Sequence, residues 1–295
     1  MANQIDETIQ NTIIADTLSN VLNPNTLPLR AFSTDISDKY AEAGDIVRVP
    51  FVDSVGDPIF NTTDWEQSDV TKSKKDVRLV RITRTAGLDD KNLRDGHRFG
   101  ELMRPLSNVM ANGVFLLTER AMAGAAKQNI GAASLFDHSV LNEKVWPTIK
   151  KGGERPSVYL ATEYFARLLK VDNQSLGTQS SAFDVIGNYD GVGTSANFVG
   201  MALHNAAFLL ANRLPHEAEE DESKDYSKAI TVEIPEIGLQ VLYTEWTVKK
   251  TRQRFCSLDT LVGIERGAEA NALLLMKDDG EYVPKKLQNV DTESA

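Results

Sequence analysis

The sequence offers one candidate for cofactor chemistry, a glycine-rich stretch at 191–196. Gly191, Gly193 and Ala196 match the G-x-G-x-x-A pattern whose backbone amides cradle a dinucleotide pyrophosphate. That pattern needs a strand before it and a helix after it. The sequence predicts a strand at 182–189 and a buried helix at 197–215, so the local context is met and the chemistry would be nucleotide-dependent oxidation and reduction.

The wider surroundings of 191–196 are unfavourable for a nucleotide site. Glu217 and Glu219 lie at about the distance expected of a ribose-binding acid, but they belong to an acidic run and not to the end of a second strand. The segments that follow are predicted strands without the intervening helices of repeated βαβ units. We therefore interpret 191–196 as a glycine-rich turn and keep a nucleotide-dependent oxidoreductase as the remote alternative.

The other chemistry-bearing residue types show no spacing that assembles a reaction. The four histidines lack ligand spacing, and neither HExxH nor CxxC occurs. They are His97, His138, His204 and His216. Cys256 lies in a predicted strand and is interpreted as a small buried apolar residue. The acidic pairs at 89–90 and 278–279 fall in polar turns, and neither a G-x-S-x-G elbow nor a Walker sequence is present. We expect no enzyme activity, no cofactor and no metal.

Composition limits the class of protein further. The chain has 295 residues, of which 41% are hydrophobic and 25% charged, so it is long enough for two cores. Its net charge of -10 is the opposite of the basic footprint of a nucleic-acid reader. If DNA is involved, we expect this protein to contain it and not to read its sequence.

The sequence also gives an expectation for the compartment. A single cysteine excludes an internal disulfide and fits a reducing environment. The N-terminus lacks the basic and apolar regions of a signal peptide, and the longest apolar run, 206–211, is far shorter than the ~20 residues that cross a bilayer. We expect a soluble protein that is made in the cytoplasm.

The chain is organised around a long amphipathic helix predicted at 99–128. Its apolar residues recur at spacings of three and four, which is typical of one buried helix face. They are Phe99, Leu102, Met103, Leu106, Val109, Met110, Gly113, Val114, Leu117 and Ala121. Pro105 is expected in the first turn, after a short lead-in capped by Asp95, which leaves roughly 23 residues and a rod of about 35 Å.

Two segments precede this helix in the N-terminal part of the chain. Residues 5–22 place apolar side chains at nearly every fourth position and predict an amphipathic helix that ends before Pro24. This helix either packs on its own core or docks on a neighbouring subunit. Residues 23–43 are predicted to be an irregular connector.

A pair of strands is predicted directly before the long helix, at 44–52 and 76–88. The polar stretch between them shows no clear period, and loops of that length are usually functional or mobile. An isolated two-stranded hairpin is marginal in water. Both observations predict an arm that gains its stability from something outside its own domain.

Charged residues on this arm suggest contacts between subunits, although a solvated charged loop is an equal alternative. Acidic residues come first, at Asp53, Asp57, Asp64, Glu66 and Asp69. Basic residues follow, at Lys72, Lys74, Lys75, Arg78, Arg81 and Arg84. Such patterning could fix the register between the arm and a neighbour. Trp65 is the predicted anchor at the tip of the arm.

The remainder of the chain alternates between predicted helices and strands. A Gly- and Pro-containing linker at 129–156 precedes a strand at 157–161 and a short helix at 162–171. An acidic solvated loop is predicted at 216–228, long antiparallel strands at 229–264, a closing segment at 270–276, and a frayed tail from 277 onward. The fold class is therefore α+β.

The order of these parts resembles the major capsid protein of tailed double-stranded DNA bacteriophages, a fold shared with encapsulin shells. Four stretches carry the resemblance: the entry to an extended loop at 43–51, a spine helix at 102–122, a helix-bearing part at 198–215, and closing strands at 238–276. The resemblance implies an N-terminal arm, an extended β-hairpin loop, a long spine helix, and peripheral and axial domains. The implied ranges are 1–43 for the arm, 44–87 for the extended loop, 88–156 and 229–256 for the peripheral domain, 157–228 and 257–277 for the axial domain, and 278–295 for a flexible tail.

The resemblance implies a structural, non-enzymatic function. The chain would assemble with itself into hexamers and pentamers of an icosahedral shell that encloses packaged double-stranded DNA without sequence-specific binding. A portal and a separate scaffolding protein are implied partners, because no room for a cleaved scaffolding segment exists before residue 44, and a decoration protein is a further candidate. No membrane is involved, and the location would be the virion, after synthesis in the bacterial host cytoplasm.

Two further points follow from the resemblance. Some relatives crosslink a lysine of the extended loop to an asparagine of a neighbouring subunit, and Lys72, Lys74 and Lys75 lie on the corresponding loop. Their partner asparagine has no match, so no crosslink is assigned. An encapsulin-like compartment is the alternative function, and the contents of the particle distinguish it from a virion.

Overall fold

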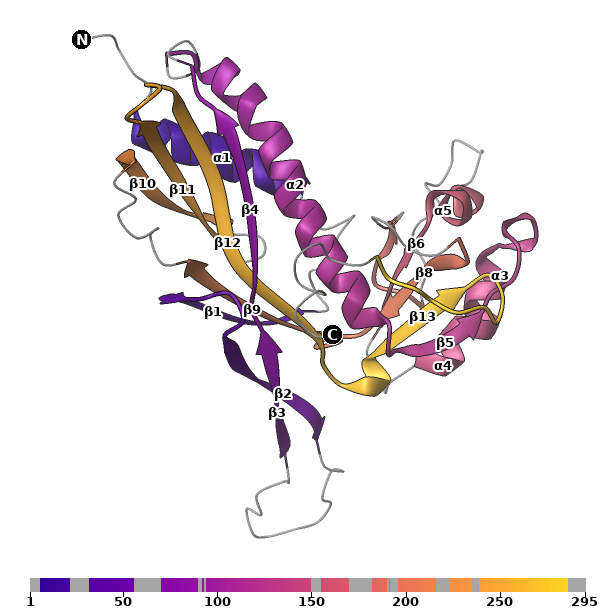
Figure 1. Ribbon diagram of the computed structural model, residues 1–295. Coiled ribbons are helices and arrows are strands. Elements are labelled where there is room, and N and C mark those ends of the chain that lie inside the picture. The colour runs from indigo at the N-terminus through magenta and orange to yellow at the C-terminus, as the bar shows by residue number, and fades with distance from the viewer. Residues whose placement is uncertain are drawn as a thin grey trace.

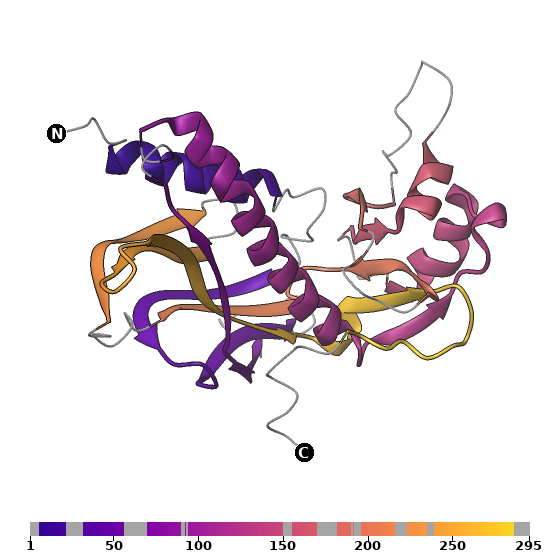
Figure 2. The same cartoon turned by 45° about the horizontal axis from the view of Figure 1, so that its top comes forward.

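The computed structural model describes residues 6–21, 32–55, 70–89, 92, 94–149, 155–169, 182–189, 191, 196–215, 223–234 and 239–285. Two sheet-based bodies lie at the two ends of helix α2 (Gly96–Met122), and a two-stranded arm projects from the larger body (Figure 1). A view turned by 45° shows the same elongated arrangement, with helix α1 (Glu7–Val21) crossing α2 near its N-terminal end (Figure 2).

The strands in chain order are β1 (Phe32–Ala41), β2 (Ile46–Val55), β3 (Val70–Arg78), β4 (Val80–Gly87), β5 (Ala126–Asn129), β6 (Ser157–Leu160), β7 (Ile186–Asn188), β8 (Phe198–Leu203), β9 (Phe208–Pro215), β10 (Lys224–Ile234), β11 (Leu239–Val248), β12 (Arg254–Arg266) and β13 (Ala272–Met276). The short helical elements are η2 (Ala133–Leu135), α3 (His138–Val140), η3 (Leu141–Val145), α4 (Trp146–Ile149), α5 (Thr162–Leu168) and η4 (Glu269–Asn271).

Helix α2 confirms the predicted long helix but begins earlier and ends earlier than predicted. The Asp95 side chain caps it by accepting a hydrogen bond from the His97 amide at 3.0 Å. Pro105 therefore lies about two and a half turns inside the helix and not in its first turn, so the prediction for Pro105 was wrong. The helix tolerates it because Pro105 and the preceding turn at Glu101 are exposed, where water can satisfy the freed carbonyl. Val109 also departs from the predicted buried face, with 39% of its surface exposed.

The large sheet has the strand order β1-β9-β12-β11-β10, and β4 pairs with β12. Its long antiparallel strands β10, β11 and β12 confirm the strands predicted at 229–264. Helices α1 and α2 share one core with this sheet, in which Ile14 and Leu18 of α1 are fully buried. The structure therefore shows the N-terminal helix packed on its own core, the first of the two predicted alternatives.

Two N-terminal predictions were wrong in detail. The connector predicted to be irregular contains β1, which pairs in parallel with β9. The single strand predicted at 76–88 is two strands that separate at Leu79, where β3 pairs with β2 and β4 pairs with β12. Leu79 is buried, so the chain changes partner at an apolar residue and carries no turn signal there.

The small sheet has the strand order β5-β13-β8-β6-β7, and α3, α4 and α5 pack with it around a second core. β6, α5 and β7 confirm the strand and helix predicted from 157 and the strand predicted at 182–189. The segment predicted to be a linker contributes β5 and the short helices up to Ile149 to this body.

The largest error concerns 197–215, which forms β8 and β9 and not a buried helix. Every residue of β8 is buried, and a short apolar run with both faces covered has no period that distinguishes strand from helix. In the folded chain β8 pairs with β6, and the two backbones approach closely at Gly200. A Cβ at this position would clash with the carbonyl oxygen of Tyr159 on β6, so the strand needs glycine here. The helix that a dinucleotide site needs after 191–196 is therefore missing, and the remote oxidoreductase alternative loses its local context.

The predicted domain ranges stay a prediction, and the structure groups the strands into the two bodies as follows. β9 and the whole of β12 belong to the large sheet, whereas the segment from β5 to α4 belongs to the small-sheet body. The tail that was predicted to be flexible is held at Tyr282, which is buried and donates a hydrogen bond to the Glu119 carbonyl at 3.2 Å. In the predicted acidic loop, the residues from Lys224 onward form β10.

Candidate assembly surface

The arm consists of β2 and β3, which pair only with each other among the described strands. They run antiparallel from the pair Ile46 and Arg78 at the root to the pair Val55 and Val70. Figure 1 shows this ribbon extending away from the large sheet. Because a two-stranded ribbon of this kind is marginal alone, its position depends on what holds the root.

A small apolar core holds the root to the large sheet. Val49, Phe51, Val77 and Leu79 of the arm are buried against β9 and β12. Burial of four such side chains supplies roughly 6–12 kcal/mol of transfer free energy as an upper estimate. The root of the arm therefore gains its stability from its own body, which corrects the expectation that the whole arm depends on something outside its domain.

Lys75 fastens the root at the crossover between the two bodies. Its Nζ donates hydrogen bonds to the carbonyls of Arg266 and Gly267, both at 2.9 Å. Gly267 follows β12 directly, and its amide bonds the Ala207 carbonyl at 2.8 Å, where the chain passes from β8 to β9. A Cβ at Gly267 would clash with the carbonyl oxygen of Ala206. Lys75 therefore joins the arm root by hydrogen bonds to the segment where the chain passes between the two bodies.

The remaining basic residues of the arm occupy different environments. Lys74 and Arg78 are exposed, and Arg84 is exposed on β4. Lys72 lies on β3, but its side chain is outside the described part of the structure, and so is Trp65. The exposed lysine and arginines stay candidates for contact with a neighbour.

Arg81 forms a partly buried pair with Asp259 on β12. Its Nε lies 3.0 Å and 2.9 Å from the two carboxylate oxygens, and a second guanidinium nitrogen approaches Oδ2, so the pair is bidentate. Burial raises the pKa of Asp259, and the hydrogen bonds from Arg81 oppose that shift. Arg81 therefore ties β4 to β12 within the chain. Asp259 was not identified from the sequence, although a lone acid in the apolar run at 258–264 is a usable signal.

Two clusters of buried polar groups lie under α2. In the first, Tyr243 donates to Glu245 at 2.8 Å beside Cys256, and burial raises the pKa of the Cys256 thiol to about 12. In the second, Tyr189 donates to Glu119 at 2.9 Å. Burial, with the adjacent Glu119 charge, raises the pKa of Tyr189 well above its ordinary value. A thiol that stays protonated is a poor nucleophile, so Cys256 is a packing residue, as predicted.

The histidines and acidic residues that the structure describes do not gather into a reaction centre. His204 is buried and its Nε2 lies 2.6 Å from the Ile149 carbonyl. In the part of the chain that the structure covers, no three His, Cys, Asp or Glu side chains are placed to hold a metal ion. No helix that the structure describes is both long and apolar enough to span a bilayer.

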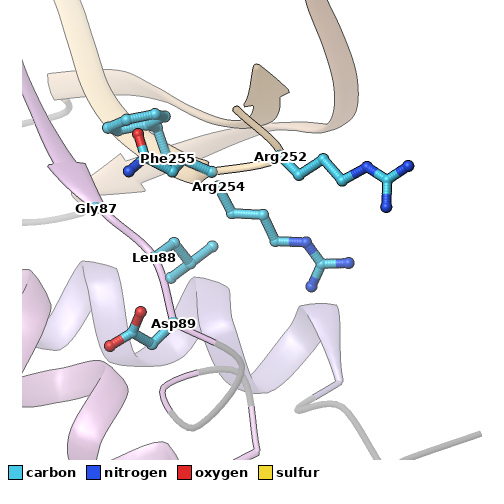
Figure 3. Close-up of a pocket in the computed structure, with 7 residues that line it drawn as sticks. Gly87, Leu88, Asp89, Arg252, Arg254 and Phe255 are labelled. Atoms are coloured by element: carbon cyan, nitrogen blue, oxygen red, sulfur yellow. The ribbon is translucent and has the colours of Figure 1, made fainter. Parts of the chain in front are cut away.

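An open cleft of about 550 Å³ lies at the far end of the large sheet, between β4 and the turn that joins β11 to β12. It is lined by Gly87, Leu88, Asp89, Arg252, Gln253, Arg254 and Phe255. Figure 3 shows the Arg252 and Arg254 side chains extending in the same direction, away from the Asp89 carboxylate. This lining contains no nucleophile paired with a base, so the cleft is a candidate contact surface and not a candidate active site.

Comparison with solved structures shows what this arrangement is similar to. The virus-like particle from Pyrococcus furiosus matches with a TM-score of 0.55 and 11% sequence identity, covering 89% of this chain and 97% of that chain. The capsid of Ralstonia phage GP4 matches with a TM-score of 0.50 and 10% identity, covering 89% of this chain and 91% of that chain. The chain has the fold of a capsid protein. The α+β architecture expected from the order of the elements is thereby confirmed.

The likeness lies in the fold and not in the sequence. No protein-family model matches this sequence, and no curated protein matches it. At identities near one in ten, side chains at corresponding positions are mostly different, so this capsid fold is built from its own set of contacts. The apolar core at the arm root, the Lys75 hydrogen bonds and the Arg81–Asp259 pair are among these contacts.

Sequence reasoning missed a basic cluster next to the cleft. Four of the six residues at 249–254 are basic, and we call Lys249, Lys250, Arg252 and Arg254 the basic tip. All four are exposed at the end of the β11–β12 hairpin. The run of charges was visible in the sequence, but its place at the end of a long hairpin was not.

Proposed function

We propose that this chain is a major capsid protein that assembles with copies of itself into an icosahedral shell enclosing double-stranded DNA. The observation that carries the proposal is the capsid fold over 89% of the chain, with a virus-like particle protein matched over 97% of its own length. A fold-level likeness of this kind supports a shared architecture and leaves the contents of the shell to experiment.

The shape of the subunit supports self-assembly. The β2–β3 arm is held at its root and extends beyond the large sheet, and a two-stranded ribbon of this kind needs shelter from outside itself (Figure 1). A neighbouring copy would supply that shelter, and reuse of the same patches around symmetry axes closes a shell. We propose the exposed residues Lys74, Arg78 and Arg84, together with Lys72 and Trp65, as contacts with a neighbour.

The charge of the chain supports a container for DNA. With a net charge of -10, the protein would not bind the phosphate backbone strongly over its whole surface. Weak retention of DNA allows both filling and release. A portal for DNA entry, a separate scaffolding protein and a decoration protein are the proposed partners, and the virion is the proposed location.

Shortening the arm tests the proposal. Val55 and Val70 are paired, so replacing 56–69 by Asn-Gly closes the ribbon with a two-residue turn that suits a hairpin. The purified wild-type chain should form particles in negative-stain images, with scaffolding protein if required. The shortened variant should remain a folded monomer by circular dichroism and light scattering. A wild-type protein that remains a compact monomer under all these conditions would refute the proposal.

An enzyme-containing compartment is the second candidate function. It is favoured by the match to the virus-like particle from Pyrococcus furiosus. Particle contents discriminate between the two functions: nuclease-protected DNA and a portal indicate a virion, and a packaged enzyme indicates a compartment.

A further inference from the structure

The basic tip concentrates positive charge on one turn of an acidic chain. Lys249, Lys250 and Arg252 are exposed, and none of them forms an ion pair with another residue that the structure describes. The net charge of the whole chain is nevertheless -10. Like charges this close in the sequence repel each other, so an anionic partner would relieve the repulsion.

The composition of the turn indicates which kind of anion it suits. The residues at 249–254, Lys-Lys-Thr-Arg-Gln-Arg, are all polar, and the structure exposes every one of them. The centre of a protein–protein contact is enriched in aromatic residues and depleted of lysine, and this turn has the opposite composition. Arginine, lysine, threonine and glutamine are instead among the side chains that contact nucleic-acid phosphates. The turn therefore fits a phosphate backbone better than an acidic protein surface.

Hydrogen bonds hold the turn in a defined conformation. The Arg252 amide bonds the Val248 carbonyl at 2.8 Å, and the Val248 amide bonds the Gln253 carbonyl at 2.9 Å. The Lys249 amide bonds the Ser223 carbonyl at 3.0 Å, which ties the turn to the start of β10. The chain therefore presents these cations from a fixed backbone, and less conformational entropy is lost when a ligand binds.

Aromatic packing next to the turn adds to this support. Tyr226, Trp246 and Phe255 are cross-strand neighbours on β10, β11 and β12, with successive ring centroids 6.3 Å and 6.0 Å apart. The Lys224 Nζ lies 5.7 Å from the centre of the Trp246 ring, which places a further cation at this end of the sheet. The rings therefore pack the three strands together directly behind the basic tip.

Arg252 has a backbone conformation that is uncommon for arginine. Its φ of 53° lies in the left-handed region, which favours glycine or asparagine. Non-glycine residues in this region store strain, and such strain clusters at functional sites. Figure 3 shows the Arg252 and Arg254 side chains extending in the same direction, away from the Asp89 carboxylate. Two guanidinium groups are therefore presented together on one side of the cleft.

We propose that the basic tip binds the phosphate backbone of double-stranded DNA without reading its sequence. Four exposed cations can contact about four phosphates, which makes each contact weak and sensitive to salt. Many copies in one shell would add such contacts together. This proposal rests on the proposed shell function and assigns to it a specific point of contact between each subunit and the enclosed DNA.

Duplex binding by the unassembled chain tests the proposal. Fluorescence anisotropy of a labelled duplex of about 30 base pairs should give a slope of about -3.6 for the logarithm of the binding constant against that of the salt concentration. The tip variant, Lys249→Gln, Lys250→Gln and Arg252→Gln, should reduce this slope to about -1 and weaken binding at least about tenfold at about 0.05 M NaCl. A different duplex sequence should leave the affinity unchanged.

A matched control variant neutralises three exposed cations elsewhere in the chain. It is Lys127→Gln, Arg155→Gln and Lys285→Gln, which changes the net charge by the same amount. This variant should bind the duplex nearly as tightly as the wild type, because the contact is local to the tip. The tip variant should keep the wild-type melting temperature, since the three cations form no ion pair within the described residues.

Several results would overturn the proposal. A wild type that does not bind duplex at low salt, an equal loss of binding in both variants, or unchanged binding in the tip variant would each exclude the tip as the DNA contact. Tighter binding to polyglutamate than to the duplex would assign the tip to an acidic protein. A tip variant that loses particle formation but keeps DNA binding would assign it to a contact between copies.

The DNA contact and the proposed function fail separately. A chain that binds duplex through its tip but forms no particles would refute the proposed shell and support the DNA contact. A chain that forms particles but shows no tip-dependent binding would do the reverse.

Discussion

Removal of the Lys75 ammonium tests whether Lys75 stabilises the arm root within one chain or contacts a neighbouring subunit. Lys75→Met keeps most of the aliphatic stem and deletes the two hydrogen bonds to the Arg266 and Gly267 carbonyls. Lys74→Met is the matched control, because Lys74 is the exposed adjacent residue and the charge change is identical. The comparison isolates the two hydrogen bonds from the loss of one positive charge.

The expected magnitude follows from the environment of Lys75. Hydrogen bonds to a charged group contribute about 1.5–3 kcal/mol each, and partial exposure of Lys75 reduces this to about 2 kcal/mol for the pair. That difference corresponds to about 30-fold faster hydrogen exchange of amides that open with the root. The amides of Leu79 and Gly267 report on it, since they bond the Asp45 and Ala207 carbonyls.

The assay combines exchange measured by mass spectrometry with thermal unfolding of the unassembled chain. Lys75→Met should lower the melting temperature by about 4 °C, and Lys74→Met should change it by less than about 1 °C. Equal behaviour of the two variants in the monomer, with loss of assembly only in Lys75→Met, would refute the intramolecular clamp. Lys75 would then be a contact between subunits.

Three further predictions concern single residues. The Cys256 pKa is raised from 9.0 to about 12, so the folded chain keeps a proton that the unfolded chain releases, and stability should fall as pH rises from about 9 to about 12. Cys256→Ala should remove that part of the slope in urea titrations, and a thiol reagent should label the wild type only on unfolding. Gly267→Ala should lower the free energy of unfolding by more than about 2 kcal/mol, because the added Cβ would clash with the Ala206 carbonyl. Gly87→Ala is the control, since open space surrounds Gly87, and urea denaturation should show a change of less than about 0.5 kcal/mol. Trp65→Ala should reduce particle yield while leaving the melting temperature of the monomer unchanged, and an equal loss in both would place Trp65 in an internal core.

Local periodicity and turn chemistry were sufficient to predict several elements. The long helix follows from apolar residues that recur on one face and from the Asp95 cap, both of which act within a few residues. Strands β10 and β11 follow from the alternation of apolar residues at 230–234 and 239–243, because side chains on one face of each strand are buried against the core shared with α1 and α2. The order of these elements was enough to indicate the capsid fold.

Tertiary structure decided the elements that are buried on both faces. In β8 every side chain is covered, so nothing in the residue pattern separates a strand from a helix, and the close approach of β6 at Gly200 settles the matter. The change of partner at Leu79 is similar, since β4 leaves the arm only because β12 offers it an edge. Burial by a distant element is not encoded in the neighbouring residues.

The contacts that position the arm also depend on distance in the sequence. Lys75 meets carbonyls 191 and 192 residues away, and Arg81 meets an acid 178 residues away. From the sequence these side chains are exposed cations on a charged loop, and their types alone indicate an interface. The folded chain brings β12 next to the arm root. Lys75 and Arg81 therefore form hydrogen bonds within the chain, whereas Lys74, Arg78 and Arg84 stay exposed at the surface.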